Sequence, residues 1–471
     1  MKGTPVTLFY KPERARLGDT IPYFADGVFH VFYLKRYADD THDRIETDWW
    51  HVSTTDFVEF EEHGPAVRRG GLRDADASAA TGSVIRIGDR WYAYYTGFGE
   101  WQKEQGGRHQ TVLRATSTDL VTWEKDAGFA LVADAERYDA HEWRDPFVLE
   151  QEDGTYLMLI AGQSLEGPAL RRGVTATATS PDGLTWTVGE PLWAPGLFSM
   201  HECPDLFRMG DRWYLVYSTL TDRTVTRYRT ATSLEGPWTA PDDDELDGLG
   251  LYAAKTVSDG ERRYLVGWCP NYAVGKDGAP WLWGGNLVVH ELLQNEDGTL
   301  RVVEAALTRR TLERDRAAAP VALAPASLGS EHGFERRILT RMPHTGLVDL
   351  VLMPQPGTKA FGVELRTDET GRSGYSVTIE PGKHRVRIDR LDRFGSDAPF
   401  DVRPFEVPEG ELAMTVVFDG EVSVVYVGGT SAFTFRGYDQ RGGSLAVFAQ
   451  EGRIEVSGEL RSIQDEKEDD R

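Results

Sequence analysis

The sequence predicts an all-β protein, built as a five-bladed β-propeller followed by a C-terminal β-sandwich. Three observations lead to this prediction: two short motifs that recur in phase through residues 5–305, a high aromatic content, and a later region of short alternating strands. The chain of 471 residues contains 13 Trp, 18 Tyr and 20 Phe. Such side chains suit the half-buried faces of β-sheets.

The first motif is a Gly-Asp or Asp-Gly turn followed by an aromatic, alternating strand. Each copy fits a hairpin turn that opens a half-buried strand. Successive copies are separated by 63, 64, 58 and 48 residues, and their acidic turn residues are Asp26, Asp89, Asp153, Asp211 and Asp259.

The second motif is a strand ending in serine, then a short acidic or glycine-containing turn and an aromatic residue. Its copies begin at Ser53, Ser117, Ser180 and Ser233, in phase with the first four turns. Two features that recur together at this period indicate propeller blades of several short strands. We therefore expect a five-bladed propeller over residues 1–310. An array of ordinary β-sandwiches is the alternative.

The pattern changes after the fifth repeat. Residues 311–328 are rich in charge, alanine and proline, which predicts a linker. Residues 329–463 return to alternating strands separated by turns at short intervals, which predicts a two-sheet sandwich. Residues 464–471 form a charged tail that we expect to be solvated.

Bulk composition excludes several classes of partner. A net charge of -23 argues against nucleic acid or an anionic membrane surface. No apolar run approaches the roughly 20 residues needed to span a bilayer, and residues 1–20 are too charged for a signal-peptide core, so we expect a cytoplasmic protein. Cys203 and Cys269 make no disulfide framework, and no zinc-ligand spacing occurs. We expect no metal, no organic cofactor, and a monomer or homodimer.

The repeat makes it possible to compare acidic residues between blades. Asp19 lies seven residues before the aspartate of its turn, Asp145 lies eight before, and Glu202 lies nine before. All three are thus predicted at an equivalent place on the first strand of a blade, which is innermost in a propeller. Because a slip of one residue would turn a side chain to the other face of the sheet, this inference depends on the register.

Three acids that converge in one pocket repel one another, so one pKa should rise while another group stays ionised. Glycoside hydrolysis needs that arrangement, with a protonated carboxyl for the leaving group and an ionised carboxylate for the anomeric carbon or water. A third acid can hold sugar hydroxyls and support developing positive charge. Sugar faces also stack on aromatic side chains. Candidate walls are Trp49, Trp50, Trp143, Trp281 and Trp283.

Each of these residues also has a structural interpretation. Asp19 can cap a turn, Asp145 can pair with the adjacent Arg144, and Glu202 can be exposed. The neighbouring tryptophans 49 and 50 can pack a core. Cys203 is expected to be a small packed residue rather than a nucleophile, because no Cys-His pairing accompanies it. His201 is expected to line the pocket or to satisfy strand hydrogen bonds.

Six motifs cover nearly the whole chain: WRDP (143–146), ECPDLF (202–207), DWWHVSTTDF (48–57), TGSVIRIGDRWYAYYTG (81–97), RRYLVGW…WLWGGNLVVHELLQNEDGTL (262–300) and VVFDGEVSVVYVGG (416–429). The most specific is ECPDLF, and RDP becomes specific in its company. Together these motifs resemble glycoside hydrolase family 32, the β-fructosidase family of invertases, inulinases and levanases.

The resemblance implies a propeller, a sandwich and a retaining mechanism. By motif, Glu202 would be the acid/base, Asp145 the transition-state stabiliser with Arg144 beside it, and Asp19 the nucleophile. The family's first motif is an Asn-Asp-Pro-Asn-Gly run, whereas this chain has LGDTIPYF at 17–24 and keeps only the aspartate. The substrate-binding candidates are Arg144, Trp49, Trp50, Ser83, Cys203, His201 and Trp283.

The function predicted from the sequence is retaining, exo-acting release of β-fructofuranosyl units from sucrose, fructo-oligosaccharides or fructans. A fructosyltransferase, in which a sugar hydroxyl replaces water, is a close alternative. A related furanosidase acting on arabinan- or xylan-type glycans is another. A non-catalytic sugar-binding propeller is the alternative outside enzymes, although a pure binder has no need of a proton donor.

Overall fold

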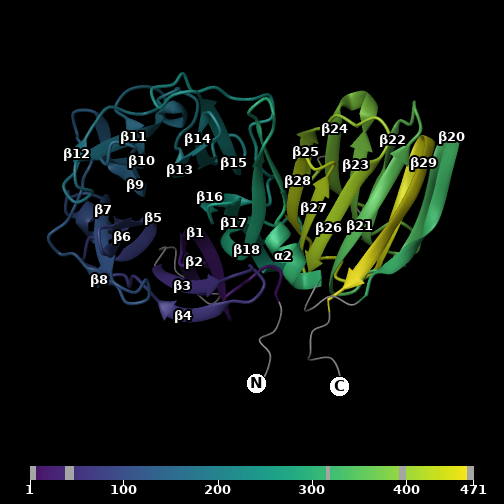
Figure 1. Cartoon of the computed structure of the whole chain (residues 1–471), viewed down its shortest axis with the longest axis horizontal. Helices are drawn as coiled ribbons and strands as arrows, with labels where there is room; N and C mark the ends of the chain where they lie inside the picture. Colours follow the sequence, from purple (N-terminus) through teal and green to yellow (C-terminus); the bar gives the residue numbers. More distant parts are fainter. Residues whose placement is uncertain (1–6, 38–46, 314–318, 392–398, 464–471) are drawn as a thin grey trace, which may run out of the picture.

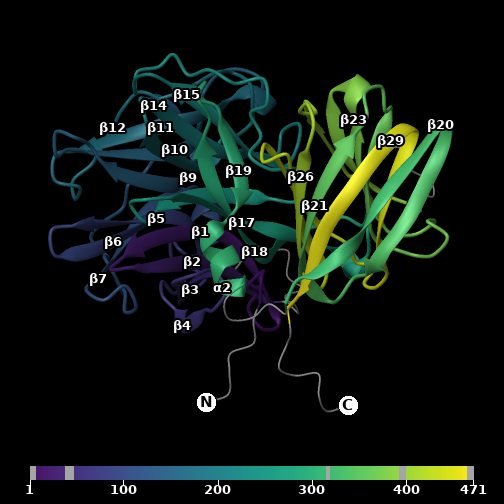
Figure 2. The same cartoon turned by 45° about the vertical axis from the view of Figure 1, so that its right-hand side comes forward.

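The computed structural model describes residues 7–37, 47–313, 319–391 and 399–463, and shows two β-domains side by side (Figure 1). In the first domain four sheets, one of which spans two blades, surround a common centre, and the second domain is a sandwich (Figure 2). The predicted fold class is therefore confirmed. The predicted tail, residues 464–471, lies outside the described residues. Within the described part of the chain, no helix is long and apolar enough to cross a membrane.

Each blade is an antiparallel meander, as the hairpin turns predict. Blade 1 contains β1 (Ala15–Ala25), β2 (Val28–Tyr37), β3 (Asp48–Thr54) and β4 (Glu61–Pro65). Blade 2 contains β5 (Ser78–Ile87), β6 (Arg90–Phe98), β7 (Gln110–Ser117) and β8 (Glu124–Lys125), with the short helix α1 (Glu100–Glu104) between β6 and β7. Blade 3 contains β9 (Tyr138–Glu150), β10 (Tyr156–Ser164), β11 (Gly173–Ser180) and β12 (Thr187–Val188).

Blades 4 and 5 depart from the simple pattern. Blade 4 contains β13 (Glu202–Met209), β14 (Arg212–Thr219) and β15 (Val225–Ala231), with isolated bridges Arg227–Glu245 and Thr230–Thr239 on its outer side. Blade 5 contains β16 (Tyr252–Ser258), β17 (Arg263–Tyr272), β18 (Trp281–Gln294) and β19 (Leu300–Glu304). Strand β18 also pairs with β1, at Leu17 and Gly285, which joins blades 1 and 5 into one eight-stranded sheet and closes the ring.

The inner strand of every blade has a register shift against its neighbour. The shifts lie between Leu17 and Thr20 in β1, Ala80 and Gly82 in β5, Arg144 and Phe147 in β9, Glu202 and Asp205 in β13, and Tyr252 and Lys255 in β16. A β-bulge bends a strand and re-aims a side chain, and bulges are frequent beside active sites. The five bulges therefore mark one level of the propeller centre.

In the second domain two layers share their longest strands. Strand β29 (Ser444–Ser462) pairs with β22 along residues 444–450 and with β21 along residues 454–462, and β20 (Val321–Arg341) follows it through both layers. The remaining strands are β21 (Thr345–Pro354), β22 (Ala360–Thr367), β23 (Tyr375–Glu380), β24 (Arg385–Arg390), β25 (Asp401–Pro404), β26 (Leu412–Asp419), β27 (Val422–Val427) and β28 (Ser431–Arg436).

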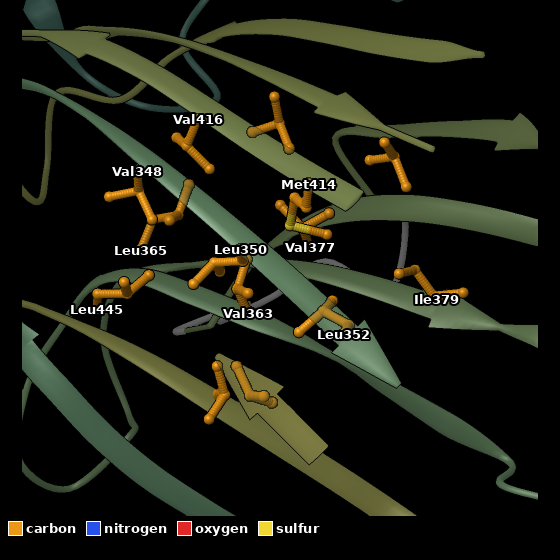
Figure 3. Packing of buried hydrophobic residues seen from close by; sticks show 14 of the residues in the cluster. Val348, Leu350, Leu352, Val363, Leu365, Val377, Ile379, Met414, Val416 and Leu445 are labelled. Atoms are coloured by element: carbon orange, nitrogen blue, oxygen red, sulfur yellow. The ribbon is translucent and has the colours of Figure 1, made fainter. Parts of the chain in front are cut away.

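The predicted linker is shorter than 311–328, because β20 already begins at Val321. Helix α2 (Ala306–Thr311) ends where that segment begins, and residues 314–318 lie outside the described residues. Alternating apolar residues of the sandwich strands meet between the layers, among them Leu350, Val363 and Met414 (Figure 3). This matches the two-sheet pattern expected from the sequence.

The sandwich packs against blades 4 and 5 through apolar and polar contacts. Val424 and Tyr426 of β27 share one buried cluster with Leu265 and Val288 of blade 5. His290 of β18 lies between Asp247 and Tyr426, with ring-nitrogen distances of 2.9 and 2.8 Å. Since these polar groups are fully buried and hydrogen-bonded, the docking is specific as well as apolar.

Blade 1 contains a stack of three histidines. The His51 ring contacts those of His63 and His30, with centroid distances of 4.4 and 5.1 Å, and His30 Nδ1 is 3.0 Å from His51 Nε2. Burial, followed by the charge of His63, lowers the pKa of His51 to about 2 and that of His30 to about 4. The fold therefore holds both rings neutral.

The stack predicts acid sensitivity of the fold. Because the folded pKa values lie below the usual 6.5, stability from the neutral rings is complete above pH 6.5 and is lost as the pH falls toward 4. His51→Phe, which can keep the ring stacking, should show a smaller drop in melting temperature between pH 7 and 5 than the wild type. The exposed His332→Gln serves as control, and an equal drop in all three proteins would contradict the prediction.

Candidate active site

A cavity of about 470 Å³ opens at the propeller centre, at the level of the five bulges. Asp19, Asp145 and Glu202 all line it, from the inner strands of blades 1, 3 and 4. The convergence expected from the repeats is therefore present. The other lining residues are Leu34, Thr47, Leu72, Ala77, Ser78, Ala80, Thr81, Phe98, Glu100, His109, Arg144, Cys203, Leu220, Tyr252, Trp281 and Trp283.

Both carboxylate oxygens of Asp19 accept a hydrogen bond from another blade. Thr81 Oγ1 donates to Oδ2 at 2.5 Å, and the indole Nε1 of Trp268 donates to Oδ1 at 3.1 Å. Burial raises the pKa of Asp19 to about 7, with the charges of Asp145 and Glu202 adding to the rise and the two hydrogen bonds opposing it. The carboxylate is thus oriented, yet it binds a proton readily near neutral pH.

The glycine before Asp19 allows an aromatic wall to approach. A Cβ at Gly18 would lie 1.9 Å from the Trp283 ring, so only glycine lets this indole lie against β1. Trp283 and Trp281 each pack against Trp268, with centroid distances of 5.8 and 5.3 Å. Blade 5 therefore provides one aromatic side of the cavity.

Asp145 is almost fully buried and is held by two backbone interactions. Its Oδ2 accepts a hydrogen bond from the Cys203 amide at 2.9 Å, and its own amide donates to Thr96 Oγ1 at 2.8 Å. Burial raises its pKa, which the adjacent Arg144 lowers and Glu202 raises. Asp145 has φ 58°, a left-handed conformation that non-glycine residues rarely adopt and that is often found at functional sites.

Glu202 is the centre of a hydrogen-bonded row of side chains. Arg144 donates to its Oε1 at 2.8 Å, and the Tyr252 hydroxyl donates to its Oε2. On its other side Arg144 donates to Glu142. Burial, then the Glu202 charge, raises the pKa of Tyr252 well above its ordinary value, so the phenol stays a donor. These contacts hold both oxygens of Glu202 at the cavity.

The structure corrects the detail of the register. The first paired residues after the bulge, Thr20, Phe147 and Asp205, each precede the turn aspartate by six residues. Asp19 is one residue before this point, while the other two acids are two and three residues before it. Counted back from the first paired residue of each strand, the acids of blades 1, 3 and 4 thus lie one, two and three positions away, not at one equivalent place. They still reach the same cavity, because the bulges change the direction of the side chains.

Four predicted substrate-binding residues lie outside the cavity lining. Trp49 is fully buried in the core between blades 1 and 2, where its Nε1 donates to the Ala80 carbonyl. The ammonium nitrogen of Lys35 lies over the Trp50 ring, 3.5 Å from its centroid. The prediction that Trp49 and Trp50 form walls of the sugar site is therefore wrong, because both rings pack against other side chains and neither lines the cavity. Trp143 is likewise fully buried in a core.

The other two corrections concern polar residues. Ser83 faces blade 3, where its Oγ accepts a hydrogen bond from the Val148 amide at 3.0 Å. His201 is fully buried, stacks on Trp193 and lies 3.0 Å from Thr175 Oγ1, and burial lowers its pKa to about 3. The side chains of Ser83 and His201 thus make hydrogen bonds within the propeller, and neither residue lines the cavity. Of the predicted set, Arg144, Cys203 and Trp283 do line it.

Three residues that contact the acids were not identified from the sequence. Thr81 belongs to a recognised segment, but only its bulge turns the hydroxyl toward Asp19. Trp268 ends the fifth aromatic repeat, and no feature of that repeat separates it from a core residue. Tyr252 precedes the fifth turn by seven residues, the same offset that marked Asp19, so a search of the repeat for any polar residue would have found it.

Cys203 lines the cavity, but its thiol is unsuited to attack. Burial raises its pKa well above the ordinary value, and the charges of Asp19 and Asp145 raise it further. The thiolate is the nucleophilic form, so this thiol is inert. Its useful group is the amide that binds Asp145.

Carboxyl groups are thus the reactive groups that converge in this cavity. Glycoside hydrolases use such carboxyl groups on either side of the bond they cleave, so the set at the propeller centre defines a site of that class. The sequence model described as "Glycosyl hydrolases family 32 N-terminal domain" matches residues 19–302, which include all three acids. The chain belongs to glycosyl hydrolase family 32.

Individual relatives are distant. The sucrose-6-phosphate hydrolase of Vibrio alginolyticus is 24% identical over 299 residues, covering 59% of this chain and 58% of that protein. An insoluble isoenzyme of beta-fructofuranosidase from Arabidopsis thaliana is also 24% identical, over 60% of this chain and 54% of that protein. The chain thus matches little more than half the length of these relatives.

Solved structures share the fold over both domains. Fructan 1-exohydrolase IIa from Cichorium intybus superimposes with a TM-score of 0.77 at 17% identity, covering 98% of this chain and 97% of that one. Sucrose-6-phosphate hydrolase from Lactobacillus gasseri gives a TM-score of 0.75 at 18% identity, covering 95% and 91%. The propeller and sandwich are therefore arranged alike.

The environment of Asp19 predicts its titration. Infrared difference spectra, with Asp19→Asn to assign the band, should show this carboxyl titrating near pH 7. Thr81→Val should move the titration upward, because it removes a donor that favours the ionised form. Titration below pH 5 in the wild type, or a downward shift in the variant, would contradict this account.

Proposed function

We propose that this protein hydrolyses terminal β-fructofuranosyl bonds with retention of configuration. The observation that supports the proposal most directly is the convergence of Asp19, Asp145 and Glu202 on one cavity. Membership of family 32 supports this class of glycosidic bond as the substrate, because the curated relatives of this chain are named for sucrose, fructofuranosides and fructans.

In the first step, Asp19 attacks C2 of the terminal fructosyl unit. The bond from C2 to the leaving oxygen breaks, and Glu202 gives its proton to that oxygen, so the leaving group departs as a neutral alcohol. The two donors to Asp19 fix its carboxylate, and the attack requires its ionised form. The product is a fructosyl ester of Asp19.

In the second step, Glu202 accepts a proton from water as the water oxygen bonds to C2. The ester bond breaks and Asp19 leaves as a carboxylate, so fructose is released and Glu202 is again protonated. Asp145 remains ionised throughout, opposite the positive charge that develops on the ring. Its anchoring by a backbone amide keeps it in place without a proton transfer of its own.

The substrates we propose are sucrose and short fructo-oligosaccharides. They suit the cytoplasmic location expected from the sequence, because a cell imports such small sugars more easily than a polymer. Cell fractionation with an antibody to the protein would test the location independently of the activity.

The activity is tested by incubation with sucrose, inulin, levan and arabinan oligosaccharides, followed by chromatography of the products. We expect free fructose from one or more of the first three. Glu202→Gln should reduce kcat by roughly 1000-fold or more, since the general acid is lost, while the exposed Glu261→Gln serves as the matched control. Transfer of fructose to a sugar, release of arabinose only, or binding without turnover would each overturn the proposal.

Retention is tested by NMR of the first fructofuranose released, before it mutarotates. The β-anomer is expected. Formation of the α-anomer would show inversion, and would remove Asp19 from the role of nucleophile.

The hydrogen bond from Tyr252 predicts a role in turnover. Tyr252→Phe should lower kcat by roughly 10- to 100-fold with little change in KM, because a hydrogen bond to a charged group contributes about 1.5–3 kcal/mol. Tyr156→Phe, a buried tyrosine of β10 outside the cavity lining, is the control. Equal kcat in both variants and the wild type would contradict the role.

A further inference from the structure

Lys255 is a buried cation that lies at the bulge of the inner strand of blade 5. Its residue is 1% exposed, although lysine is rarely buried without a charged partner. It occupies the position that Phe147 and Asp205 occupy in blades 3 and 4, the first paired residue after the bulge. It is absent from the cavity lining, so it lies behind the acids rather than against the substrate.

The side chain of Lys255 crosses the propeller centre. Its Nζ donates a hydrogen bond to the Gly82 carbonyl of blade 2 at 2.8 Å, and lies 5.7 Å from the ring centroid of Phe147 in blade 3. Blades 2 and 5 are not neighbours in the ring, since blade 1 separates them. A single ammonium group of blade 5 therefore contacts blade 2 and also blade 3, the blade that carries Asp145.

Arg144 is one positive charge near Asp145, and it also serves other carboxylates. Arg144 is shared between Glu142 and Glu202, and its Nε is 4.0 Å from Asp145. Arg263 is the main charge acting on the buried Asp205. The charge of Lys255, whose Nζ lies 5.7 Å from the ring centroid of Phe147 two residues after Asp145, also lowers the pKa of Asp145. The ionisable groups that face Asp145 from the strands around it are Asp19, Arg144, Glu202, Cys203 and Lys255.

We propose that Lys255 is a positioning residue, whose ammonium group keeps Asp145 ionised and in place behind the bound sugar. The inference rests on the proposed function, in which Asp145 must carry a negative charge opposite the developing positive charge of the fructosyl ring. Lys255 makes no contact with substrate in this scheme. It acts through the electrostatic field at Asp145 and through its bond to blade 2.

Two variants separate the charge from the hydrogen bond. Lys255→Gln removes the charge and keeps an N–H donor for the Gly82 carbonyl, while Lys255→Arg keeps the charge. Because Asp19 also titrates near pH 7, the acid limb of the kcat/KM profile reports both carboxyl groups, and we expect it to move up in the glutamine variant, as expected for loss of a nearby opposite charge. The arginine variant should restore the wild-type profile. Melting temperatures of both variants report whether they fold.

A measurement without turnover distinguishes the inference from the proposed function. Infrared difference spectra, with Asp145→Asn to assign the band, should show Asp145 titrating at higher pH in Lys255→Gln than in the wild type and in Lys255→Arg. An unchanged Asp145 titration in a folded glutamine variant would overturn the inference. Absence of fructose release by the wild type would overturn the proposed function, and the titration would still test the role of Lys255.

Discussion

Electrostatic repulsion among three carboxyl groups that line one cavity is the constraint on which this structure depends. Each group is stabilised differently: Asp19 by two side-chain donors, Asp145 by a backbone amide, and Glu202 by an arginine and a tyrosine. Every one of these donors comes from a different blade from the acid it serves. The cavity therefore exists only when the ring of blades is closed.

The β-bulges solve a geometric difficulty that a regular strand cannot. In an unbroken ladder, side chains alternate between the two faces of a blade, and few would point along the propeller axis. At the bulges of blades 3, 4 and 5, the residues before the irregularity are Arg144, Glu202 and Tyr252, and they bond to one another across the blade boundaries. The repeated irregularity thus builds one continuous polar row.

Much of the fold and the three acids could be predicted from the sequence, because turn motifs repeat locally and ECPDLF and WRDP are contiguous. The donors to the acids were harder to predict. Tyr252 and Trp268 reach Glu202 and Asp19 from a distant part of the chain, and a two-residue period says nothing about a side chain within a bulge. Trp49 was misassigned for a related reason, since a core tryptophan and a wall tryptophan have the same pattern.

The carboxylate of Asp145 is bound by a main-chain group, the amide of Cys203. Every amino acid except proline carries the amide that Cys203 provides, so the anion contact does not depend on the thiol. What the position does require is a residue that tolerates φ 51°. The thiol is therefore dispensable for this contact, and a different side chain at position 203 would change the shape of the cavity while the amide that binds Asp145 stays in place.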